Sequence, residues 1–147
     1  MSSFITTQPT LVSNGPIIPV KIGLPKIISD ALQQQGKSIP SPVQVNALID
    51  TGASRSHISP KISAQLDLIP HGITQMLTAG NPTLTNIFTV SLDIGIVFSQ
   101  QMVFDPIEVI EAPLIGQTNI DCIIGRDILN VGILIYIGYA NTFSFSI

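Results

Sequence analysis

Two short segments of the sequence combine residue types that could carry out proton-transfer chemistry. The first is Ala47-Leu48-Ile49-Asp50-Thr51-Gly52-Ala53-Ser54, in which an apolar run ends at a carboxylate, followed by a hydroxyl residue and a glycine. The second, much further along the chain, is Cys122-Ile123-Ile124-Gly125-Arg126-Asp127-Ile128-Leu129. A carboxylate can exchange protons with water, and a glycine beside it lets the backbone turn tightly and lets another backbone approach.

The elements that must position these two segments are mainly strands. Alternating apolar residues over 43–49 predict a strand that runs into Asp50. The apolar run at 120–124 predicts a second, buried strand, and residues 126–130 predict one helical turn after it. Each segment therefore places its polar residues at the end of a strand.

Turn residues and helix signals divide the rest of the chain into short elements. Pro25 opens a helix that ends at Gly36, and Ser59 followed by Pro60 begins a second helix. Further strands are expected over 17–22, 73–77, 83–94, 96–104, 108–112, 133–139 and 143–147, with a break at Asp105-Pro106. Many short strands with little helix indicate an all-β fold, a closed or partly open antiparallel β barrel or sandwich with one or two short helices.

The 147 residues accommodate one domain with a real core. We assign this domain to residues 15–147, because the Ser/Thr-rich residues 1–14 carry little pattern and are expected to form a flexible N-terminal segment.

Charged residues are scarce, at 10% against roughly 25% in an average soluble domain, whereas 45% of the residues are hydrophobic. The net charge of −3 leaves no basic stripe for phosphates, so nucleic-acid binding is not expected. No run approaches the length of a membrane span, and the start of the chain lacks a secretion signal, so we expect a cytoplasmic protein. A surface with so few charges also makes self-assembly an expectation.

The chain offers no metal-ligand pattern, and we expect neither a metal nor another cofactor. Cys122, the only cysteine, lies in an apolar run and is interpreted as core filler. His57 and His71 have no carboxylate or cysteine at ligand spacing and are interpreted as surface or loop residues.

Together the two segments resemble the retropepsin-like aspartic proteases, the single-domain relatives of retroviral proteases. The resemblance spans Pro16 to Ile147, with an N-terminal strand, Asp-Thr-Gly-Ala, a β hairpin, Ile-Ile-Gly-Arg and a C-terminal strand in order, and it is closer to bacterial members. It implies hydrolysis of peptide or protein substrates by two aspartates that share one proton. Because the chain has one Asp-Thr-Gly, it also implies a homodimer in which each copy gives Asp50.

The resemblance also assigns roles to the residues around Asp50. Thr51 would bond across the two-fold axis to the partner's loop, Gly52 would approach the substrate, and Ala53 would keep the loop small. Ile124, Gly125 and Arg126 would support the loop from the distal strand, with Gly125 letting the two segments pass closely.

The hairpin tipped by Thr78-Ala79-Gly80-Asn81 would be the flap that closes over an extended peptide. The C-terminal strand, Thr142 to Ile147, would lie near the dimer interface, with Phe143, Phe145 and Ile147 on one face.

Some residues depart from the retroviral pattern. Retroviral members have an acidic residue shortly after the motif, and it pairs with the distal arginine. Here the motif is followed by Ser54, Arg55 and Ser56, so Arg126 must pair with another carboxylate or with backbone carbonyls. Asp127 replaces an asparagine, and Gly80 is the single glycine of the flap.

Several alternatives remain beside this hypothesis. The domain could bind extended peptides or only dimerise, without catalysis. Asp50 could cap a turn through its own side chain, accept a phosphoryl group, or form a dyad within one chain with Asp121 or Asp127. Phosphoryl transfer lacks a partner aspartate and a phosphate loop.

A serine nucleophile is a further alternative, suggested by Ser54 and Ser56 close to His57. It lacks the glycine-flanked turn that exposes such a nucleophile. The scattered aspartates of the chain are interpreted as turn, cap or solvated positions; they are Asp67, Asp93, Asp105, Asp121 and Asp127.

Overall fold

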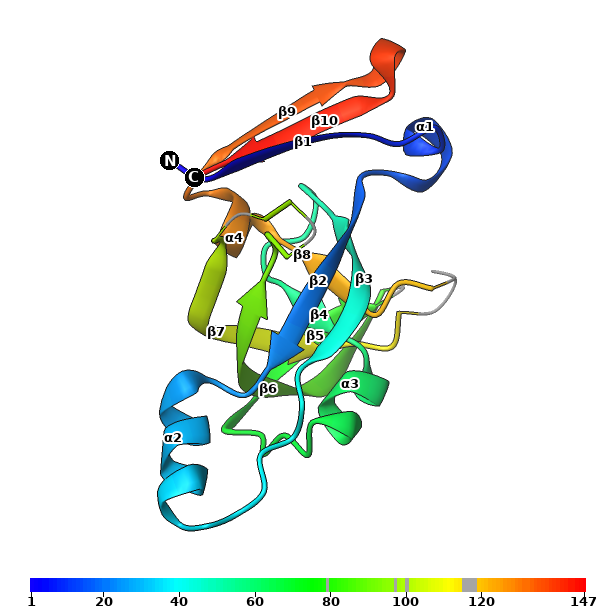
Figure 1. Cartoon of the computed structure of the whole chain (residues 1–147). Coiled ribbons are helices and arrows are strands. Elements are labelled where there is room, and N and C mark those ends of the chain that lie inside the picture. Colours follow the sequence, from blue (N-terminus) through cyan, green and yellow to red (C-terminus); the bar gives the residue numbers. More distant parts are fainter. Residues whose placement is uncertain (79, 97, 100, 115–118) are drawn as a thin grey trace.

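Strand β3 (Val43–Ile49) ends directly before Asp50 and pairs with two other strands of a seven-stranded sheet. The computed structural model describes residues 1–78, 80–96, 98–99, 101–114 and 119–147. On one side of β3 lies β2 (Ile17–Gly23), which is antiparallel, and on the other lies β8 (Cys122–Ile124), which is parallel. The parallel register places Ile49 beside Ile124, so the two chemistry-bearing segments leave the sheet at the same end (Figure 1).

The seven-stranded sheet closes on itself. Its order is β2-β3-β8-β4-β7-β6-β5, with β4 (His57–Ile58), β5 (Gly72–Thr78), β6 (Asn81–Asp93) and β7 (Val103–Glu111). The long strand β6 also pairs with β2, which joins the two sides of the sheet into a barrel. The predicted all-β barrel is therefore confirmed. Parallel pairing is found for β3 with β8 and for β4 with β7.

The core lies inside this barrel, and the alternation of the strands explains which side chains fill it. In β2, Ile18, Val20 and Ile22 are fully buried, whereas Lys21 between them is exposed. Burial of such aliphatic side chains is the main favourable term in folding. The low fraction of charged residues fits this core, because nearly every strand places aliphatic residues inside the barrel.

A separate three-stranded sheet lies across one end of the barrel (Figure 1). Its order is β1 (Ser3–Thr7), β10 (Thr142–Ser146) and β9 (Ile133–Ile137), all antiparallel. The pairing brings the two ends of the chain together, because Ser2 N–H donates to the Ile147 carbonyl and Ile147 N–H to the Ser2 carbonyl, at 2.8 and 2.9 Å.

The N-terminal residues differ from the flexible segment expected over 1–14. Ser3–Thr7 forms β1, and a short helix, α1 (Leu11–Asn14), follows it. Phe4 is 4% exposed and stacks on Phe98, with ring centroids 4.2 Å apart. Only Phe4 and Leu11 of this segment are buried, so the apolar side chains that attach it to the core are too few to form a sequence pattern.

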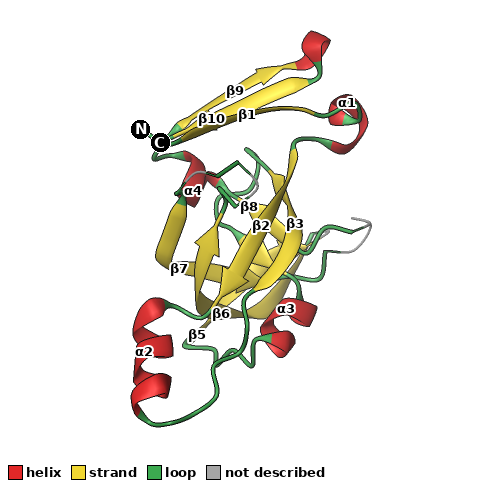
Figure 2. Ribbon diagram, in the orientation of Figure 1, coloured by secondary structure: helices red, strands yellow, loops and turns green. Residues whose placement is uncertain are grey.

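Short helices connect the strands (Figure 2). The two helices expected after Pro25 and Ser59 are α2 (Lys26–Gln34) and α3 (Pro60–Gln65), and the expected helical turn is α4 (Arg126–Leu129). A 3-10 turn, η1 (Gly138–Ala140), joins β9 to β10. None of the helices in the described ranges is long and apolar enough to cross a membrane.

The expected strand over 96–104 is wrong, and the expected break at Asp105-Pro106 is an irregularity within a single strand. Strand β7 runs from Val103 to Glu111 through that dipeptide, and the described residues between 94 and 102 form no strand. The register of β6 with β7 shifts between Val90 and Leu92. This bulge accommodates a proline that cannot donate to the ladder.

Candidate active site

Asp50 leaves the sheet at the end of β3 and begins a tight loop. Its N–H donates to the Ile124 carbonyl at 3.0 Å, which continues the pairing of β3 with β8 by one residue. Its side-chain Oδ1 accepts from Gly52 N–H at 2.8 Å, and its carbonyl accepts from Ala53 N–H at 3.2 Å. The side-chain turn that one alternative expected is thus present, and it uses only one carboxylate oxygen. Oδ2 accepts no hydrogen bond from the described residues.

Arg126 holds the outer part of this loop from the first turn of α4. Its backbone N–H donates to the Ala53 carbonyl at 2.9 Å, and its Nη1 donates to the carbonyls of Thr51 and Gly52 at 2.7 and 3.2 Å. The partner that the sequence left open is therefore a set of backbone carbonyls. A guanidinium presents several donors in a fixed plane, so it suits carbonyls that must keep one arrangement.

A buried polar network ties the end of the loop to the same helix. Ser56 is fully buried and donates through its N–H and Oγ to the Asp127 carboxylate, at 2.7 and 2.8 Å. Gly125 N–H donates to Ser56 Oγ at 3.0 Å, and Ile128 N–H donates to Asp127 Oδ1 at 3.0 Å. Hydrogen bonds to a carboxylate are stronger than those between neutral groups, so this network anchors the loop.

Sequence reasoning missed the role of Ser56 and Asp127. It interpreted Asp127 as a turn, cap or solvated position, although the aspartate in place of an asparagine after Arg126 was a visible departure from the retroviral pattern. That departure was the available signal, since a carboxylate can accept from both groups of one serine.

Gly125 lies where the two segments cross. A Cβ built on Gly125 would stand 2.5 Å from the carbonyl carbon and oxygen of Arg55, closer than real Cβ atoms approach a backbone. A side chain there would push the loop away from the distal strand. The two segments touch because this position has none.

Of the ionisable groups around the loop, Arg55 and His71 have a carboxylate partner. Arg55 Nη2 lies 2.7 Å from Glu108 Oε2, and His71 Nε2 lies 3.5 Å from Glu108 Oε1. His57 is half-buried, and its Nδ1 is buried without a hydrogen-bond partner among the described residues. Burial lowers the pKa of His57 below its ordinary value, against the opposing charges of Asp127 and Asp50.

These contacts also decide the chemistry open to Ser56 and to Cys122. The Ser56 hydroxyl donates to Asp127 and is fully buried, so it is not an exposed nucleophile beside His57. Burial raises the pKa of Cys122 to about 12, so its thiol stays protonated and unreactive. In the described ranges no three His, Cys, Asp or Glu side chains gather as a metal site.

The carboxylates suggested as partners of Asp50 within one chain are engaged elsewhere. Both oxygens of Asp127 accept hydrogen bonds from the buried network. Asp121 accepts from Ser59 Oγ at 2.8 Å and from Lys61 Nζ at 3.3 Å. Neither carboxylate is placed against Asp50 by any contact of the described residues.

The expected flap is a hairpin of β5 and β6, whose register pairs Thr78 with Asn81. Gly80 has a φ of 85°, a left-handed value that glycine tolerates. Ala79 lies outside the described residues. The register puts Ile73, Leu77 and Leu84 on the same face, where they are 67, 79 and 69% exposed. The hairpin therefore carries apolar side chains that its own chain does not cover.

The comparisons with known proteins agree with the fold. A family model described as aspartyl protease matches residues 38–128, and the chain belongs to this family. A retropepsin-like aspartic protease from Rickettsia conorii superposes with a TM-score of 0.54 at 13% identity, covering 97% of this chain and 89% of that one. This likeness shows the retropepsin-like fold.

Two further structures match with lower TM-scores. The EIAV protease complexed with the inhibitor HBY-793 has a TM-score of 0.46 at 20% identity, covering 79% of this chain and 86% of that one. The retroviral protease-like domain of Ddi1 from Leishmania major has a TM-score of 0.45 at 16% identity, covering 86% of this chain and 86% of that one. No curated protein matches the sequence significantly.

Proposed function

We propose that the chain is an aspartic endopeptidase that works as a homodimer, in which Asp50 of each copy forms half of a catalytic dyad. The observation that carries the proposal is the state of the Asp50 carboxylate. One oxygen is held by Gly52 N–H, and the other accepts no hydrogen bond from the described residues. A loop that fixes a carboxylate and leaves one oxygen open is suited to proton transfer with a bound water.

The second carboxylate of the dyad comes from the partner in this proposal. Asp121 and Asp127 are engaged, which disfavours a dyad within one chain. Two carboxylates close to each other cannot both ionise, so the pair holds one proton between them. Such a pair works at mildly acidic pH, where the shared proton is retained.

The reaction follows from this shared proton. The ionised carboxylate takes a proton from water, the protonated one donates to the scissile carbonyl oxygen, and the water oxygen attacks the carbonyl carbon. The tetrahedral intermediate then breaks its C–N bond, the leaving nitrogen takes the proton that came from water, and the carbonyl re-forms as its hydroxyl proton returns to the dyad. Thr51 and Gly52 are exposed in the single chain, and their carbonyls are held by Arg126, so the loop is rigid where a partner loop would meet it. The β5–β6 hairpin would cover an extended peptide and exclude water.

In this proposal the terminal sheet provides the surface for the second copy. Phe143 and Phe145 share one face of it, as expected, and are buried in the core of their own chain at 0 and 1% exposure, so the partner would meet other residues of the sheet. The opposite face of the same sheet carries Ile5, Ile133 and Ile135, which are 69, 62 and 50% exposed. Apolar side chains gathered on one sheet face favour association.

The central test replaces Asp50 with asparagine. Asp50→Asn keeps the shape of the side chain and removes the proton acceptor, so cleavage of a mixed peptide library should fall by about 10²- to 10⁴-fold, measured by mass spectrometry. Asp30→Asn, in an exposed pair with Lys26, is the matched control and should cleave like the wild type. Full activity in Asp50→Asn contradicts the proposal. A wild-type chain that binds peptides and cleaves none indicates the silent module instead.

Mixing tests whether the partner completes the site. When wild-type and Asp50→Asn chains are mixed equally and allowed to exchange, about a quarter of the dimers contain two wild-type copies. Activity should therefore fall to about a quarter of that of the same total amount of wild-type chain. Activity that falls only to a half shows that each chain works alone.

A further inference from the structure

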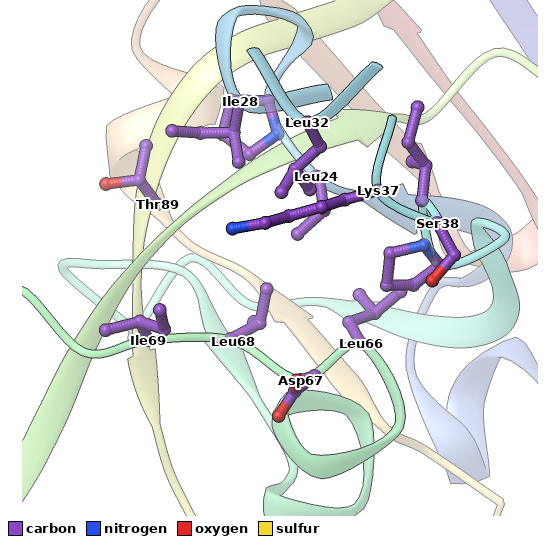
Figure 3. Close-up of a pocket in the computed structure, with 13 residues that line it drawn as sticks. Leu24, Ile28, Leu32, Lys37, Ser38, Leu66, Asp67, Leu68, Ile69 and Thr89 are labelled. Carbon is purple, nitrogen blue, oxygen red and sulfur yellow. The ribbon is translucent and has the colours of Figure 1, made fainter. Parts of the chain in front are cut away.

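An apolar cavity of about 590 Å³ lies at the opposite end of β3 from Asp50 (Figure 3). Residues 37–40, which line it, precede the first residue of β3, whereas Asp50 follows the last. Seven residues of strand at about 3.3 Å each separate the two ends by roughly 20 Å. The cavity is therefore distinct from the candidate active site, and its volume falls in the range of small-molecule sites.

Two apolar walls face each other across this cavity. One wall is formed by α2 and the residue pair before it, and the other by the segment that leads from α3 to β5 (Figure 3). The wall residues are Leu24, Ile28 and Leu32 on the α2 side, and Leu66, Leu68 and Ile69 opposite.

The α2 wall is unusual because the helix buries none of its residues. Ile28 is 47% exposed on the side that lines the cavity. Ile69, across from it, is 86% exposed. An amphipathic helix normally covers its apolar side with other side chains, so the cavity is bounded by apolar surface that the described residues leave open.

Lys37 crosses the space between these walls. Figure 3 shows its side chain extended between Ile28 above and Leu68 below, with the ammonium on the side of Thr89. Lys37 forms no ion pair with the described residues, although Asp67 also lines the cavity. The cavity thus combines apolar walls with one unpaired cation, the few-polar-groups pattern of ligand sites.

We propose that this cavity binds an aliphatic monocarboxylate, with the hydrocarbon chain between the apolar walls and the carboxylate on Lys37. Each buried methylene favours binding, and the carboxylate supplies the partner that the ammonium lacks. A group with more negative charge would be repelled by Asp67 at the same cavity. A chain of roughly ten carbons fits the available volume.

The competing explanation is that the Lys37 stem only covers apolar surface while its ammonium stays in water, as lysines often do. In that case the cavity would take any apolar chain without regard to its charge, or no ligand at all. The charge of the head group therefore separates the two explanations.

The test is a titration of the full chain with decanoate below its micelle concentration, followed by NMR of the leucine and isoleucine methyl groups. We expect saturable shifts that centre on Leu32, Leu68 and Ile69. Acetate, which lacks the chain, should give none, and decyltrimethylammonium, which carries the opposite charge, should bind at least about tenfold more weakly.

Variants locate the site. Lys37→Gln should weaken decanoate binding about tenfold and remove the preference over decyltrimethylammonium, whereas Lys21→Gln, at an exposed lysine on β2 away from the cavity, should bind like the wild type. Ile28→Trp should fill the space and abolish the shifts, with circular dichroism as the check on folding. The proposal is overturned if decanoate does not saturate, if both head groups bind equally, or if Lys37→Gln binds as tightly as the wild type. None of these measurements depends on Asp50, so they stand apart from the proposed protease function.

Discussion

The two ends of strand β3 differ in the interactions that surround them. At the Asp50 end, hydrogen bonds hold the loop: Arg126 donates to its backbone carbonyls, Asp50 N–H donates to the Ile124 carbonyl, and Ser56 donates to the Asp127 carboxylate. At the other end, α2 buries none of its residues and faces an open apolar cavity. Directional bonds fix atoms in position, whereas apolar walls define only a volume. The barrel therefore carries a loop fixed by hydrogen bonds at one end of β3 and an open apolar cavity at the other.

The largest effect that would sharpen this contrast is expected for Gly125→Ala. The new Cβ would lie 2.5 Å from the Arg55 carbonyl group, so the loop must move and the free energy of unfolding should fall by about 3 kcal/mol. Gly36→Ala, at the other end, meets no atom within 4 Å and should cost only about 1 kcal/mol for its φ of 67°.

Urea denaturation of both variants measures the difference. Equal losses would show that the Asp50 end tolerates displacement as well as the α2 end does, and the contrast between the two ends would not stand.

An intermediate effect is expected for the buried network. Asp127→Asn keeps the size of the side chain but removes its charge, and it should lower the free energy of unfolding by about 2 kcal/mol because the Ser56 N–H and hydroxyl lose their carboxylate.

Ser56→Ala and the double variant complete a cycle with Asp127→Asn. If the two residues act as one unit, the double variant should cost clearly less than the sum of the single ones, by about 1 kcal/mol. Additive losses in thermal or urea unfolding would show that the contact does not couple the loop to α4.

The smallest effect concerns pH. Because burial lowers the pKa of His57, the unfolded chain takes up a proton at a pH near 6.5, where the folded chain does not. Stability from this group is therefore present above that pH and is lost as the pH falls below it. The fold is thus less stable under the mildly acidic conditions that the proposed dyad requires.

His57→Gln should flatten this dependence. The drop in urea midpoint between pH 7.5 and pH 5.5 should be smaller in the variant than in the wild type, while His71→Gln, at an exposed salt bridge, should leave the drop nearly unchanged. If the urea midpoint of His57→Gln falls with pH as steeply as that of the wild type, the acid sensitivity comes from other groups.

Much of the barrel could be predicted because its strands alternate strongly. The alternation of Ile18, Val20 and Ile22 with other residues predicts a strand face that points into the core. The helices after Pro25 and Ser59 could be predicted because those residues are typical of helix starts. Elements with weak patterns escaped prediction. Strand β1 depends on Phe4 finding Phe98 and Phe143, a long-range contact that no local pattern encodes.

The candidate site could likewise be predicted in part. The proximity of Asp50 to Gly125 was expected, because both segments carry a recognisable motif. The sequence left two kinds of partner open for Arg126, a carboxylate or backbone carbonyls, and it could not choose between them because backbone carbonyls have no signature in the sequence. Nor could the cavity beside Lys37 be foreseen, because its walls come from segments that only the fold brings face to face.

The reciprocal hydrogen bonds of Ser2 with Ile147 give the molecule nearly adjacent ends. A few added residues would therefore suffice to join them into a ring without disturbing β1 or β10. Such a ring could be reopened within residues 37–42, which belong to no helix or strand. The resulting circular permutant would have its new ends near Lys37, and its Asp50 loop would stay uncut.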